Sequence, residues 1–164
     1  MQKSYLMFPV IFLGLACASD ESHTDSGGES QVASTTFASA GKIAVLDAFA
    51  PAPATPDRGA VYFTIQNSDS IDIRIVSVSV DLAQTTAIHT QRMDGDMMSM
   101  VPMEGVLVPA GESVKLQPGG MHVMLMGFVR TYGVGDTLGV EVVFEDGVAI
   151  SFAVGVSAYA EAMQ

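Results

Sequence analysis

The sequence predicts an all-β domain, a β-sandwich or small barrel, and three observations support this class. Short segments rich in β-branched and aromatic residues recur from about residue 42 to residue 156. Glycines, prolines and short polar residues, which suit turns, separate these segments. No segment has the long 3.6-residue apolar period of an amphipathic helix. Half-buried strands at this spacing must cover their apolar faces with another sheet, as a sandwich or small barrel does.

The expected strands follow one another along the chain with turns between them. In residues 71–80, Asp72 and Arg74 alternate with Ile71, Ile73 and Ile75, which predicts a strand with one solvated face. AQTTAI, just before His89, is expected to end a further strand. The main expected strands are KIAVLDAFA (42–50), AVYFTIQN (60–67), IDIRIVSVSV (71–80), MMSMVPM (97–103), VLVPA (106–110), ESVKLQP (112–118), MHVMLMGFV (121–129), TLGVEVVFE (137–145) and VAISFAVGV (148–156).

The first 18 residues are predicted to be a signal peptide. Lys3 supplies a positive start, and the apolar run at 5–15 is too short to span a bilayer comfortably. Cys17 follows Gly14-Leu15-Ala16, which resembles a bacterial lipoprotein processing box, although Gly14 stands where a larger aliphatic residue is usual. Ordinary cleavage after Ala18 is the alternative. We expect export to the periplasm or cell envelope, with a lipid anchor on Cys17 as the favoured route.

Composition divides the remaining chain into three parts. Residues 19–40 are rich in Ser, Thr, Asp, Glu and Gly and are predicted to be a disordered polar linker, in which His23 is a solvated residue and not a ligand. Residues 41–157 form the predicted folded domain, and residues 158–164 are a C-terminal tail. The net charge of −11 argues against a basic patch that binds nucleic acid or an anionic membrane surface.

Methionines are unusually concentrated in one part of the domain. Setting aside the leader and the tail, all eight lie between Met93 and Met126. Any one of them is more often an adaptable core filler than a ligand. In QRMDGDMMSMVPM (91–103), however, several occupy a polar, glycine-containing stretch where they cannot all be buried. Exposed thioethers at this density point to a soft metal.

The two histidines of the predicted domain, His89 and His122, lie close in sequence to these methionines. Along the strand PGGMHVMLMGF, side chains alternate between faces, so His122, Met124 and Met126 share one face. Imidazole and thioether together favour copper, particularly Cu(I), whereas zinc sites usually include thiolates or carboxylates. The absence of a cysteine after Cys17 argues against a blue-copper centre.

The order His89, ten residues, Met100, twenty-one residues, His122, one residue, Met124 resembles the H-x10-M-x21-H-x-M signature of the periplasmic PCuAC copper chaperones. AVYFTIQN, VPAGESVKLQPGGMHVMLMGF and GDTLGVEVVFEDG are similar to the family's flanking blocks, so the resemblance covers about residues 41–156. There are departures: Thr90 stands where the family often has an acid, and Phe49-Ala50-Pro51 replaces a Trp-containing stretch.

The resemblance implies a cupredoxin-like fold and a Cu(I) carrier that is not an enzyme. It implies metal ligation by His89, Met100, His122 and Met124, and delivery to a copper-accepting protein such as the copper-containing subunit of cytochrome c oxidase. From the residues, Met97, Met98 and Met103 are candidate auxiliary donors, and Asp94, Asp96 and Glu104 could offset the charge of the ion. A copper-dependent redox enzyme and a structural or adhesive lipoprotein domain remain alternatives.

Overall fold

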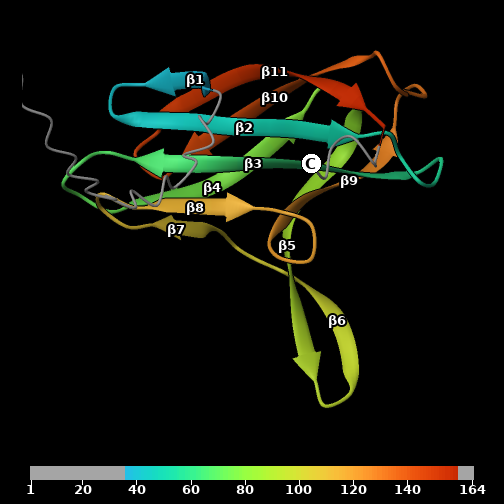
Figure 1. Cartoon of the computed structure of the whole chain (residues 1–164), viewed down its shortest axis with the longest axis horizontal. Coiled ribbons are helices and arrows are strands. Elements are labelled where there is room, and N and C mark those ends of the chain that lie inside the picture. The colour runs from blue at the N-terminus through green and yellow to red at the C-terminus, as the bar shows by residue number, and fades with distance from the viewer. Residues whose placement is uncertain (1–35, 159–164) are drawn as a thin grey trace, which may run out of the picture. The chain divides into compact units, whose positions relative to one another are not determined.

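In the computed structural model, which describes residues 36–158, every regular element is a β-strand, as predicted (Figure 1). Within this range no helix is long and apolar enough to cross a membrane. The strands are β1 (Thr36–Ala40), β2 (Ile43–Pro51), β3 (Arg58–Asn67), β4 (Ile73–Val80), β5 (Ala83–Asp94), β6 (Met97–Pro102), β7 (Val106–Val108), β8 (Ser113–Leu116), β9 (His122–Phe128), β10 (Thr137–Phe144) and β11 (Ala149–Ser157).

Hydrogen bonds join the strands into one continuous path in the order β6-β5-β9-β3-β2-β11-β10-β4-β7, with β1 added to β2 and β8 added to β3. The pairs are antiparallel apart from β11 and β2, which run parallel. The path folds over so that alternate residues of its strands meet in one apolar core. Val45, Ile65, Val123, Leu138 and Val142 are fully buried there. Their burial follows the two-residue period that the sequence shows.

Most strand boundaries lie one or two residues from the predicted ones, and two of the differences have a clear structural basis. Residues 36–40, the end of the predicted linker, form β1, because Ala38 and Ala40 pack against the core while the backbone pairs with β2. Ile71 is exposed and precedes β4, which begins at Ile73. The predicted signal peptide with Cys17, residues 19–35 of the predicted linker, and residues 159–164 lie outside the described residues.

Strands β5 and β6 form a hairpin that extends past the rest of the sheet (Figure 1). The pairing of β5 with β9 stops at His89, whereas its pairing with β6 continues to Asp94. Gly95 and Asp96 form a two-residue turn, and the φ of +63° at Gly95 suits a two-residue hairpin loop with glycine in the first central position. Among the described strands, residues 90–101 are therefore a two-stranded ribbon that joins the rest of the sheet at its base.

Candidate metal centre

The strand register places all four predicted ligands on one face of the sheet formed by β6, β5 and β9. His89 is the direct cross-strand partner of His122, and Met100 is opposite Gln91, which is two residues from His89. Met124 is two residues from His122 on β9. Directly opposite residues share a face, and so do residues two apart along a strand. Met100 is thus a diagonal neighbour of His89, and Met124 a strand neighbour of His122.

The two imidazoles lie side by side at the point where β5 and β9 end their pairing. Their ring centroids are 6.1 Å apart, with an angle of 45° between the planes. His122 is buried, and its Nδ1 lies 3.0 Å from the carbonyl oxygen of Gly120. Because a carbonyl oxygen only accepts hydrogen bonds, this Nδ1 carries the proton and donates. Nε2 of His122 is then left with its lone pair, as a metal ligand requires.

His89 is partly buried, and its Nδ1 is fully enclosed without a hydrogen-bond partner among the described residues. Burial lowers the pKa of His89 below its ordinary value of 6.5, and the neighbouring His122 lowers it further. At neutral pH the imidazole is therefore uncharged, so one of its two ring nitrogens keeps a free lone pair. A buried nitrogen with no partner is costly, and a bound cation would satisfy it.

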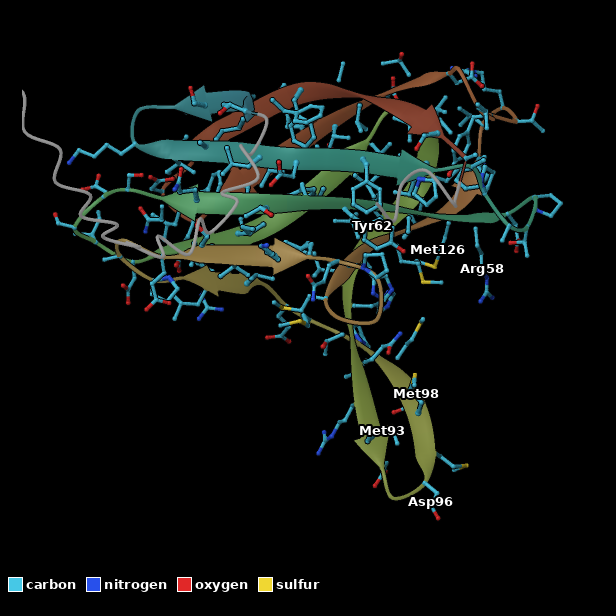
Figure 2. The ribbon with its side chains drawn as sticks, viewed as in Figure 1. Arg58, Tyr62, Met93, Asp96, Met98 and Met126 are labelled. Atoms are coloured by element: carbon cyan, nitrogen blue, oxygen red, sulfur yellow. The ribbon has the colours of Figure 1, made fainter. Side chains whose placement is uncertain are left out.

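A cavity of about 310 Å³ opens on the same face, and three of the four predicted ligands line it. Figure 2 shows Arg58, Tyr62 and Met126 in this part of the body, well away from the hairpin tip. His89 does not line the cavity; it lies beside His122 on the β5 side. The lining residues that matter here are Met100, His122 and Met124, with Tyr62, Arg58 and the loop 51–55 completing the wall.

Aromatic side chains support His122 from the side away from His89. The Tyr62 ring lies 6.5 Å from the His122 ring, and Phe49 lies 4.9 Å from Tyr62. The Phe49 departure from the family pattern is therefore one ring removed from the histidine. Thr90, the other departure, is the partner of Val101 and faces the opposite side of the hairpin from His89. Pro51, the last residue of the first departure, lines the cavity with Met100, His122 and Met124, whereas Thr90 lies on the other face of the hairpin.

His89 is in the middle of β5, which differs from the strand end that the sequence predicts. The polar residues that follow it continue as a strand because β6 pairs with them.

The candidate auxiliary donors lie in three different places in the structure. Met103 packs against the core, and Met97 is opposite Asp94 on the far face of the hairpin. Met98 is on the donor face, by which we mean the face of the hairpin that carries His89 and Met100. The three candidate charge-compensating acids are all exposed: Asp94, Asp96 and Glu104.

Sequence reasoning did not single out three contributors to this face. Met93 is the cross-strand partner of Met98, and only the position of the two-residue turn could have indicated this. Tyr62 and the Gly120 carbonyl contact His122 from other segments, and no motif marks them. In residues 36–158 no three His, Cys, Asp or Glu side chains gather into a group that could hold a metal ion.

Comparisons with known proteins agree with this architecture. A family described as "Putative lipoprotein LpqE-like" matches residues 43–156. The protein "Putative lipoprotein Lxx21020" of Leifsonia xyli subsp. xyli is 29% identical over 104 residues, which are 63% of this chain and 63% of that protein. The chain therefore spans less than two thirds of the length of that relative.

Several solved structures resemble the chain, and two of them are copper forms. One is the copper-bound PCuAC domain from PmoF2, with 22% identity, a TM-score of 0.64, and coverage of 76% of this chain and 98% of that domain. This likeness is one of fold, and it confirms the predicted fold class. The other is the solution structure of CuI-DR1885 from Deinococcus radiodurans, with 32% identity, a TM-score of 0.54, and coverage of 68% and 76% of the two chains.

Proposed function

The chain belongs to the LpqE-like family and has a PCuAC-type domain, and we propose that it is a copper chaperone that binds Cu(I) and passes it to another protein. In this proposal His89, Met100, His122 and Met124 are the ligands. The observation that supports it most strongly is that two imidazoles and two thioethers from three strands share one face of one sheet. The relative from Deinococcus radiodurans, whose Cu(I) form has been solved, makes the same ion the first choice.

The chemistry of the donors favours Cu(I) over Zn(II). Thioether sulfur is a soft ligand that selects Cu(I), whereas zinc is held mostly by imidazole with thiolate or carboxylate. All four proposed ligands are neutral, and burial keeps the pKa of His89 low, so binding need not displace a proton from that ring near neutral pH. The bound ion would keep its positive charge, and the acidic chain as a whole would attract it.

Release follows from how unequally the ligands are held. His122 is buried and fixed by its hydrogen bond to Gly120, whereas 53% of the surface of Met100 is exposed. An acceptor can therefore approach the ion from the side of Met100, and one of its own ligands can replace the thioether. Each exchange forms one copper–ligand bond as another breaks, and the copper stays Cu(I). The two histidines would be the last ligands to leave.

The proposed place of action is the periplasm or cell envelope, with Cys17 as the site of a lipid anchor. This rests on the predicted signal peptide and on the description of the family as lipoproteins. An anchor would keep the carrier near membrane-bound acceptors. A copper-accepting protein, such as the copper-containing subunit of cytochrome c oxidase, is the proposed partner. We propose no enzymatic activity.

Titration of the purified chain with Cu(I) against a competing chelator tests the ligand set. We expect one tightly bound equivalent and a loss of affinity of about tenfold or more in His122→Ala, His89→Ala and Met124→Leu. The matched control is the exchange variant Ser99→Met with Met100→Ser. It keeps the composition but moves the thioether to the position opposite Arg92, on the other face. Its affinity should fall as far as that of Met100→Leu.

The outcomes separate the proposal from its alternatives. Wild-type affinity in the exchange variant would show that the face of Met100 does not matter. Equal retention of Zn(II) in competition would contradict the selectivity for Cu(I). A chain that binds no stoichiometric copper would be a structural or adhesive domain. Turnover of a substrate by the copper-loaded chain would support a redox enzyme instead.

A further inference from the structure

The donor face does not stop at Met100 but continues to the tip of the hairpin. Met93 is the direct cross-strand partner of Met98, and this pair is two residues beyond the pair formed by Gln91 and Met100. All of these residues therefore share the face of His89. Met93 and Met98 are 63% and 64% exposed. Figure 2 shows both of them, with Asp96, on the part of the hairpin that extends from the body.

Spacing along the hairpin makes Met100 the connection between the tip and the histidines. Residues on one face of a strand repeat every ~7 Å, so the pair at the tip, Met100 and the histidine pair form successive steps of this length. Opposite side chains start only ~5 Å apart at their Cβ atoms. The methionine side chain has three rotatable bonds and can cover such distances. Met93, Met98 and Met100 can therefore converge on one ion without a change in the backbone.

Packing does not explain these side chains. Beyond His89 none of the described strands pairs with the hairpin as a third strand, so Met93 and Met98 do not contribute to the core. Exposed strand positions are more often occupied by Thr or charged residues, which tolerate water and resist association. Met97 is also exposed, but it is on the opposite face, beside Arg92, Ser99 and Asp94. Met97 therefore provides an internal comparison, because it differs from Met98 chiefly in the face it occupies.

We propose that Met93 and Met98, with Met100 as a shared third ligand, form an outer Cu(I) site through which the ion enters and leaves the inner site. This inference rests on the function proposed above. In each step one copper–sulfur or copper–nitrogen bond forms as another breaks, with no change of oxidation state. Asp94 precedes the turn and Asp96 lies within it. Against the single positive charge of Arg92, these two carboxylates give the tip a negative potential that attracts the cation.

Transfer kinetics test the outer site under anaerobic conditions. The Cu(I)-loaded chain is mixed with a small dithiol chelator, and copper loss is followed by stopped flow. In Met93→Leu/Met98→Leu we expect release about tenfold slower than in wild type, with unchanged equilibrium affinity. Met97→Leu, the matched control, should release copper at the wild-type rate. An unchanged rate in the double variant would overturn the proposal.

Methyl NMR of a chain labelled at the methionine methyl carbons separates the two sites. In His122→Ala, with the inner site disabled, Cu(I) should shift the methyl signals of Met93, Met98 and Met100 and leave that of Met97 in place. In wild type the methyl signal of Met124 reports the inner site alone, whereas that of Met100 reports both sites. If those two shift while Met93 and Met98 never do, the inner site stands and the outer one is refuted. If the double variant slows transfer only to a protein acceptor, the tip is a docking surface and the proposal fails.

Discussion

Leucine at either histidine is expected to weaken copper binding, but the two substitutions should change the stability of the metal-free protein in opposite directions. Nδ1 of His89 is enclosed and has no hydrogen-bond partner in the described part of the chain, so His89→Leu removes an unsatisfied polar atom. Nδ1 of His122 donates to Gly120, so His122→Leu removes a hydrogen bond and leaves that carbonyl oxygen unpaired. The difference between the two variants measures how much stability the metal-free protein loses by keeping the nitrogen of His89 without a partner.

The magnitudes follow from these contacts. A buried polar group without a partner costs about 1–3 kcal/mol, and the lower end applies to His89 because the residue is only partly buried. We expect His89→Leu to raise the free energy of unfolding by about 1 kcal/mol. His122→Leu should lower it by about 1–2 kcal/mol, since the residue is buried and its partner becomes unsatisfied. For a domain of this size the two melting temperatures should differ by roughly 10 °C.

Thermal and urea unfolding of the metal-free variants measure this difference, and chelator competition confirms the loss of copper affinity in both. His89→Gln is a useful control, because its amide retains polar atoms that need partners and should give little stabilisation. If His89→Leu destabilises the metal-free protein as much as His122→Leu does, His89 is an ordinary packed histidine. The view that it is held ready for a metal would then be wrong.

Two further predictions concern the protein without metal. Burial lowers the pKa of His89 from 6.5, so as the pH falls below that value the unfolded chain binds protons more readily than the folded one. The free energy of unfolding, measured by urea titration, should therefore fall as the pH drops from 7 towards 5. In His89→Leu this free energy should depend less steeply on pH. Gly59→Ala should cost about 1–3 kcal/mol, because its Cβ would overlap the hydroxyl of Tyr132, for which residues 36–158 supply no hydrogen-bond partner. Tyr132→Phe should recover part of this loss in thermal unfolding, and full additivity of the two changes would contradict the contact.

The sequence predicts those strands well in which one face is apolar. In β9 the alternation places Val123 and Leu125 in the core and leaves His122, Met124 and Met126 on the other face, and both expectations hold. The prediction fails at β5, where the alternation is weak because most side chains are polar or small and Ile88 is the buried hydrophobic residue. Pairing with β9 and β6 sets the length of this strand, and the local sequence does little to predict that pairing.

The convergence of the donors was less accessible to reasoning from residues. His89 and His122 become neighbours through the pairing of β5 with β9, which is a contact between distant parts of the chain. Alternation groups His122 with Met124, but it cannot bring β5 beside them. The intervals between the four residues suggested one site only through the resemblance to a family. The buried nitrogen of His89 and the hydrogen bond of His122 required the structure.

The strand register gives a geometric meaning to the ten residues that separate His89 from Met100. In a hairpin with a two-residue turn, two residues on opposite strands share a face when an even number of residues separates them. Ten intervening residues place Met100 opposite the residue two positions beyond His89, and four place Met98 directly opposite Met93. Three residues separate Met93 from Met97, which falls on the other face. The same parity that places Met100 on the face of His89 therefore selects which exposed methionines share that face, so one feature of the hairpin would define both the proposed binding site and its proposed entrance.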